Sequence, residues 1–133
     1  MSHMYYDTFI AVAPDFGGAT AKIPVERAGK KTVAQMQYAL LIDEPFVHTQ
    51  EDVLFSVWLE RQDLGDLAGD EVAALRSEYF ATGRACLRAS PLTKSHGWGV
   101  VFDADGRAAL CAMDSPEYEA YASSDDLTVV AAM

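Results

Sequence analysis

The sequence has few basic side chains for its length, and acidic residues dominate it. Ten Lys and Arg residues stand against twenty Asp and Glu residues in 133, so the formal net charge at neutral pH is -10. Nucleic-acid phosphates require a basic face on the protein, and anionic membrane surfaces attract the same kind of face. We therefore expect no nucleic-acid partner and no membrane partner.

Cysteine is also scarce, and long apolar runs are missing. Cys86 and Cys111 are too few for a disulfide framework, and no run reaches the length of a membrane span. The start "MSHMYYDTF" lacks the features of a signal peptide, so we expect a cytoplasmic protein. The two cysteines, His48 and His96 show no paired ligand spacing, so we predict no metal and no cofactor.

Enough apolar residues are present for one folded domain. Half of the residues are hydrophobic, including six Phe, six Tyr and two Trp, and this composition supports a packed core. "SHM" is typical of a cloning remnant, so residues 1–4 are set aside and 5–133 are expected to be a single domain. We predict an α+β fold in which a small, mainly antiparallel sheet is covered by three or four helices.

Local signals place the elements of this domain along the chain. The expected strands are 8–13, a hairpin over 98–113 with its turn at Asp105-Gly106, and 127–133; the expected helices are 32–45, 49–62, 70–83 and a short one after Ser115. Thr32, Thr49 and Asp70 are suited to cap their helices. In the first helix, Val33, Met36 and Leu40 form an apolar stripe that should be buried. Gln37 falls beside that stripe, and a buried amide must find a hydrogen-bond partner.

Several short motifs occur in one order along the chain: "TFIAVAPD", "GKKT", "QY", "TQEDVLF", "CLRASPL", "GWG", "DADGRAAL" and "SPEY". From about Thr8 to Tyr118 the sequence thus resembles a family of short bacterial proteins classed as a domain of unknown function. Relatives tend to have Cys-Pro where this chain has Phe16-Gly17. The resemblance implies no activity and no catalytic residues.

Two segments of this acidic chain contain no Asp or Glu, namely 27–42 and 79–102. The first holds Lys30 and Lys31 just before an expected helix, and the second holds Arg88, Lys94 and His96. Backbone N–H groups and the dipole at a helix N-terminus favour anions. Our leading hypothesis is that these five side chains converge to bind an anionic small molecule or a carboxylate group on a partner.

Three other interpretations stay open. If "RACLRA" is extended, Arg84, Cys86 and Arg88 share one face, and the two guanidinium groups favour the thiolate of Cys86. With His96 as its base, Cys86 would be the nucleophile of an enzyme. The chain could instead be an interaction module without a pocket. Finally, the acid-free segments could simply face the core, where unpaired carboxylates are costly.

Overall fold

The computed structural model describes residues 4–82 and 86–133. Of the expected cloning remnant only Met4 is described, and Gly83 and Arg84 also lie outside the described residues. The elements are β1 (Thr8–Ala11), α1 (Val33–Asp43), α2 (Gln50–Gln62), α3 (Gly69–Tyr79), the 3-10 helix η1 (Leu87–Ala89), α4 (Pro91–Ser95), β2 (Trp98–Phe102), β3 (Ala108–Ala112), α5 (Pro116–Ala122) and β4 (Thr128–Ala131).

The strands form one sheet in the order β3-β2-β1-β4. The hairpin partners β2 and β3 are antiparallel, and so are β1 and β2. The last strand, β4, lies parallel to β1, with Thr8 opposite Thr128. The α+β class and the mainly antiparallel sheet are therefore confirmed, and the one parallel pairing, between β1 and β4, makes the sheet mixed. The described residues hold five α-helices, more than the three or four expected.

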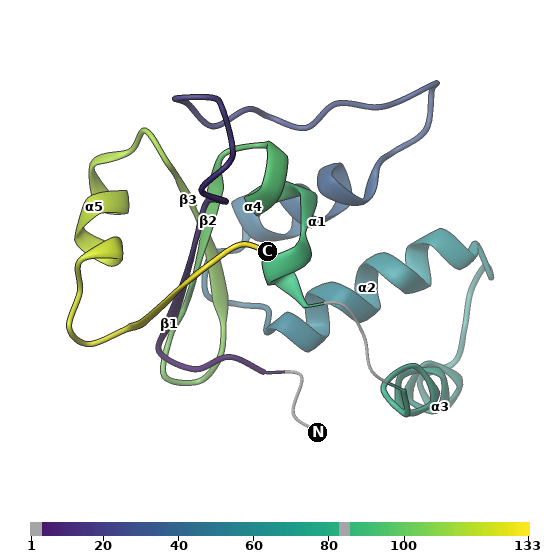
Figure 1. Cartoon of the computed structure of the whole chain (residues 1–133). Helices are drawn as coiled ribbons and strands as arrows, with labels where there is room; N and C mark the ends of the chain where they lie inside the picture. Colours follow the sequence, from purple (N-terminus) through teal and green to yellow (C-terminus); the bar gives the residue numbers. More distant parts are fainter. Residues whose placement is uncertain (1–3, 83–85) are drawn as a thin grey trace.

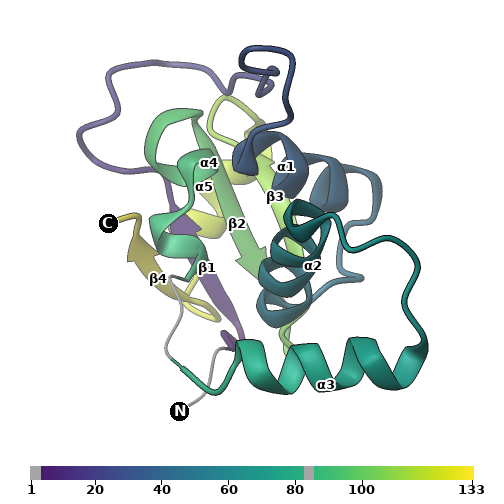
Figure 2. The same ribbon diagram turned by 90° about the vertical axis from the view of Figure 1, so that its right-hand side faces the viewer.

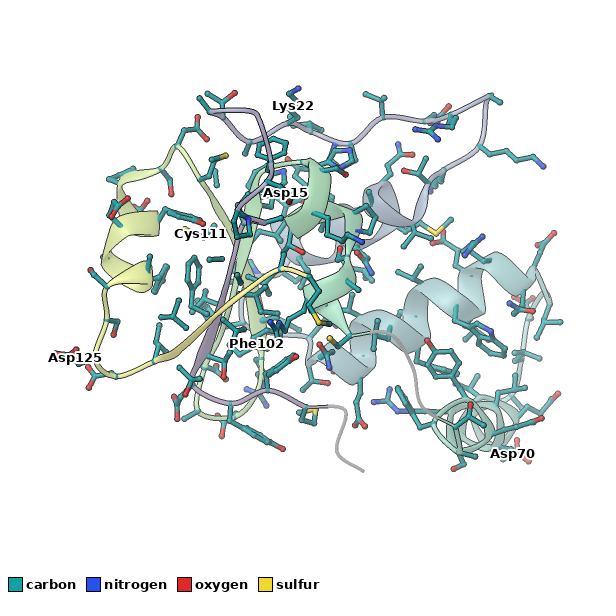
Figure 3. All side chains as sticks on the ribbon, viewed as in Figure 1. Asp15, Lys22, Asp70, Phe102, Cys111 and Asp125 are labelled. Carbon is teal, nitrogen blue, oxygen red and sulfur yellow. The ribbon has the colours of Figure 1, made fainter. Side chains whose placement is uncertain are left out.

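Helices cover both faces of the sheet, but unequally. In Figure 1 the strands are seen nearly edge-on, with α5 on one side and α1, α2 and α4 on the other. Figure 2 looks onto the larger helical layer and shows α3 running across its lower end, below α2. Phe102 faces this layer and packs with Leu41 and Val53, whereas Cys111 faces α5 (Figure 3). The main core thus lies between the sheet and α1 and α2.

Two predicted helix starts are confirmed. The Thr32 hydroxyl accepts a hydrogen bond from the backbone N–H of Gln35, and Thr49 forms a capping box with Asp52. The third start is one correction: the N-cap of α3 is Ala68, and Asp70 lies inside the helix. The Glu71 carboxylate accepts from the backbone N–H of Ala68 (3.3 Å), which is the contact that the third helical residue makes in a capping box, while Ala68 provides no side-chain cap in return.

The segment after Cys86 corrects two further expectations. Leu87–Ala89 is a 3-10 helix rather than an extended strand, so same-face spacing does not hold across Cys86 and Arg88. Pro91–Ser95, expected to be a loop, is the helix α4, and its N-cap Ser90 accepts from the backbone N–H of Leu92. Ser followed by Pro is a helix-start signal. Ser90-Pro91 begins α4 in the same way as Ser115-Pro116 begins α5.

The stripe that α1 buries is rotated by one residue from the prediction. The fully buried positions are Ala34, Gln37 and Leu41, whereas Val33, Met36 and Leu40 are only partly buried. Those three side chains line surface cavities instead. The apolar stripe of α1 therefore faces hollows beside the helix, and the helix is anchored in the core by an alanine, an amide and Leu41.

Candidate functional site

The second acid-free segment runs through the interior as η1 and α4. The Gln50 side-chain oxygen accepts from the backbone N–H of Leu87 (2.9 Å), and Ser90 Oγ donates to Gln37 Oε1 (2.5 Å). Leu92 and Thr93 are fully buried. The hydrogen bond expected for Gln37 is thus present and fixes this segment to α1. Packing explains the absence of carboxylates at these buried positions, because an unpaired charge there would be costly.

The basic residues of the first acid-free segment face outward. Lys30 is exposed, and its backbone closes a tight turn with Arg27 through Ala28 and Gly29. Both turn residues have positive φ (54° and 77°). Lys31 is exposed too, and its Nζ lies 3.8 Å from the Glu60 carboxylate of α2. The structure therefore places Lys31 beside α2, on the rim of a cavity that also contains acidic side chains.

The basic residues of the second segment point to different places. Arg88 Nε donates to the backbone oxygen of Ala131 in β4 (2.9 Å), and the Arg88 carbonyl accepts from the N–H of Met133. Lys94 is exposed on α4. In the described part of the chain, Lys31 and His96 line different cavities, and Arg88 is engaged with β4. The five predicted anion-binding residues do not share one cavity.

His96 lines a cavity of about 290 Å³ where the two acid-free segments meet, hereafter the first cavity. Arg27, Thr32 and Ser95 contribute polar groups, and Val33 and Pro91 contribute apolar surface. Glu26 also lines it. This hollow therefore combines a guanidinium, an imidazole and the N-terminus of α1 at one place on the surface.

The hydrogen bonds of His96 orient its ring. Nδ1 lies 3.0 Å from the carbonyl oxygen of Pro91 and 3.2 Å from Ser95 Oγ. A carbonyl only accepts, so Nδ1 carries the proton in this contact. Nε2 is then the atom that can accept from a ligand when the ring is neutral, or donate to one when it is protonated.

Two backbone donors open into the same cavity. At the start of α1, the Thr32 hydroxyl accepts a hydrogen bond from the N–H of Gln35, and the Thr32 carbonyl accepts from the N–H of Met36. The N–H groups of Val33 and Ala34 precede them, and within the described residues they have no hydrogen-bond partner. Both residues line the first cavity. Unpaired donors at a helix N-terminus form a ready site for an anion.

Cys86 lies at the other end of this segment from His96. Cys86 precedes η1 as its N-cap, and His96 follows α4 as its C-cap. The Cys86 sulfur accepts a hydrogen bond from Tyr5 Oη (3.4 Å). Burial and this contact raise the pKa of Tyr5 to about 12, although the nearby Arg88 acts in the opposite direction. Tyr5 thus keeps its proton and acts as a donor, so it supplies no base for Cys86.

The second cysteine belongs to the packing under α5. Cys111 is 5% exposed. Burial raises the pKa of its thiol, against a hydrogen bond with Ser115, which lowers it. A raised pKa disfavours the reactive thiolate. Within residues 4–82 and 86–133, no group of three or more His, Cys, Asp or Glu side chains is placed to hold a metal ion.

The sequence hypothesis included the backbone N–H groups at the start of this helix, but it missed Arg27. The available signal was the dipeptide Ala28-Gly29, whose left-handed turn reverses the chain and sets Arg27 opposite Lys30. Gly favours such a conformation, but alanine does not. Because the turn was not recognised, Lys30 and Lys31 were selected in place of Arg27.

The fold is that of a small α+β protein, and its first cavity lies at the N-terminus of α1 and is lined by a guanidinium, an imidazole and a carboxylate. None of the helices in the described part of the chain has the length and apolar character needed to span a bilayer. The chain belongs to the Family of unknown function (DUF6157), whose model matches residues 1–133. The predicted family resemblance is thereby confirmed. Neither the curated proteins nor the solved structures gave a match.

Proposed function

We propose that this protein binds a small, singly charged carboxylate in the first cavity. The observation that carries the proposal is the pair of unpartnered N–H groups, Val33 and Ala34, in a hollow that Arg27 and His96 also line. Two parallel N–H donors suit the two oxygens of a carboxylate, and a guanidinium can bind the same group bidentately. His96 Nε2 can donate a further hydrogen bond to the carboxylate when the imidazole is protonated.

The charge of the surroundings supports a monoanion. Glu26 lines the cavity with Arg27, and the whole chain carries a formal charge of -10. Repulsion from this background grows with the charge of the ligand, so a phosphate or dicarboxylate is disfavoured relative to a monocarboxylate. The acidic surface also disfavours nucleic-acid and membrane partners. We place this activity in the bacterial cytoplasm, where the free thiols of Cys86 and Cys111 would persist.

Acetate titration followed by amide NMR tests this proposal. The N–H signals of Val33 and Ala34 should shift in a saturable way, because hydrogen bonding to an anion deshields these protons. Arg27→Gln should weaken acetate binding severalfold, and added salt should weaken it further. Inorganic phosphate should bind less tightly than acetate.

Lys94→Gln is the matched control, because it removes an exposed cation that does not line the first cavity. Its acetate affinity should equal that of the parent chain. Shifts that do not saturate, or that chloride reproduces at the same ionic strength, would show that the cavity binds no carboxylate.

A further inference from the structure

A second cavity, of about 330 Å³, lies on the other side of Val33 and Pro91, which line both hollows. Residues of α1, α2 and the start of α4 form its walls, together with Tyr79 of α3. Its volume is at the lower end of the range for small-molecule sites. In the described part of the chain, no Asp or Glu lines it, whereas acids line the first, third and fourth hollows.

Gln37 leaves a hydrogen-bond donor in this cavity. The residue is 4% exposed, lines the hollow and accepts from Ser90 Oγ through its Oε1. Ser90 Oγ itself accepts from the N–H of Leu92, so its proton is free to go to Gln37 and this fixes the orientation of the amide. The Nε2 amino group then has no partner among the described residues. Among the described residues, the fully buried polar side-chain atom without a partner is Gln35 Oε1, so the Gln37 amino group is reachable from the cavity and can donate to a ligand there.

Arg61 provides the charge at the rim. It is exposed in the last turn of α2 and lines the second cavity. The neighbouring Glu60 pairs with Lys31 instead, and Arg61 has no ion-pair partner among the described residues. A guanidinium that is free at the mouth of an acid-free hollow suits a carboxylate.

The remaining walls are apolar. Leu54, Val57 and Trp58 of α2 face the cavity from one side. Trp58 packs in a cluster of three rings, since its centroid lies 5.8 Å from that of Phe55 and 5.2 Å from that of Tyr79, and these two lie 5.8 Å from each other. A rigid aromatic wall beside aliphatic side chains binds the apolar body of a ligand.

We propose that the second cavity is a binding site for a small amphipathic monocarboxylate. Its apolar body lies against Leu54, Val57 and Trp58, and one oxygen accepts from Gln37 Nε2. The carboxylate pairs with Arg61. This site uses neither Arg27 nor His96, so it stands independently of the carboxylate site in the first cavity.

Titration with 3-phenylpropanoate, followed by calorimetry and NMR, tests the site. The side-chain NH₂ signals of Gln37 should move on binding, and acetate, which lacks an apolar body, should leave them unchanged. Arg61→Gln should weaken binding by about tenfold or more, because a hydrogen bond to a charged group is lost. Lys94→Gln is the matched control, because it removes an exposed cation that lines neither cavity, and it should leave the affinity for 3-phenylpropanoate unchanged.

Gln37→Glu is a second variant. It keeps an oxygen that can accept from Ser90, but it replaces the donor with a charge that repels the ligand, so binding should be lost. If this variant does not fold, the proposal is still tested by the Gln37 side-chain signals of the parent chain and by the affinity of Arg61→Gln for 3-phenylpropanoate. The proposal is overturned if 3-phenylpropanoate does not bind, if it binds without moving the Gln37 signals, or if Lys94→Gln weakens binding as much as Arg61→Gln does.

Discussion

At the scale of single residues, Asp52 connects two helices. Its Oδ2 accepts from the backbone N–H of Thr49 (3.0 Å) at the start of α2, and its Oδ1 pairs with Arg76 Nη2 of α3 (3.1 Å). Burial on its own would raise the pKa of Asp52, but the bonds from Thr49 and Arg76 together lower it below its usual value. The carboxylate form is therefore the one that the folded state stabilises.

We predict that Asp52→Asn lowers stability at neutral pH by about 1 kcal/mol, which is typical for a capping contact. A group with a lowered folded-state pKa contributes stability above its unfolded pKa and loses it as the pH falls through the folded one. The difference between parent and variant should thus be largest near pH 7 and shrink below about pH 4. Urea unfolding at both pH values measures it. Asp70→Asn, which changes an exposed acid on α3, should show a smaller difference.

For Tyr5 we predict a pH dependence of stability that is opposite in sign to that of Asp52 and lies at high pH. Its pKa is raised to about 12, so the folded chain keeps the phenol proton that an unfolded chain loses near pH 10. The raised pKa of Tyr5 contributes to the stability of the fold fully below about pH 10. This contribution is lost as the pH rises toward the pKa of Tyr5 in the folded state. In a spectrophotometric titration, Tyr5→Phe should remove a late-ionising tyrosine. If the variant removes an ordinary one instead, the contact with Cys86 is not formed in solution.

At the scale of elements, local signals predicted most helices and all strands. Thr32, the Thr49 box and Ser115-Pro116 are start signals that act within one turn, so sequence alone reveals them. The 3-10 helix η1 has no such signal, because its position depends on a hydrogen bond from Leu87 to Gln50, far away in the sequence. Parallel pairing of β4 with β1 is likewise a long-range property.

The candidate sites were less predictable than the elements. His96 was selected from its acid-free segment and does line the first cavity. A segment without Asp or Glu can carry basic side chains at the rim of a cavity, or it can be buried in the core. The sequence pattern is the same in both cases, so it did not distinguish them. Which side of α1 faces a hollow depends on how α2 and α4 pack beside it. Gln37 was recognised as a buried amide, but its free amino group follows only from the geometry of Ser90.

We predict that Gln50→Leu destabilises the η1 segment. The substitution leaves the buried N–H of Leu87 without its acceptor, which costs about 1–3 kcal/mol. Chemical denaturation should show this loss, and the Leu87 amide should exchange with solvent faster than before. Gln62→Leu changes an exposed residue on the same helix and should be close to neutral. Equal effects from the two variants would contradict the assigned role of Gln50.

At the scale of the whole molecule, Arg88 connects the interior segment to the edge of the sheet. Its side chain donates to Ala131 and its carbonyl accepts from Met133. We predict that Arg88→Ala speeds hydrogen exchange in β4, while the β2–β3 hairpin stays protected. The backbone bond to Met133 remains in this variant, so β4 should loosen rather than detach. Uniform loss of protection across the sheet would contradict this local role.

The parallel pairing of β1 with β4 also governs the order in which the sheet can form during translation. Phe9 and Ile10 in β1 are fully buried in the finished fold. One edge of this strand, however, has no hydrogen-bonding partner until Thr128–Ala131 has been synthesised. Until then an apolar strand presents unpaired backbone groups, which is the situation that favours strand addition between nascent chains. We therefore expect chains that end before β4 to aggregate more readily than the finished fold.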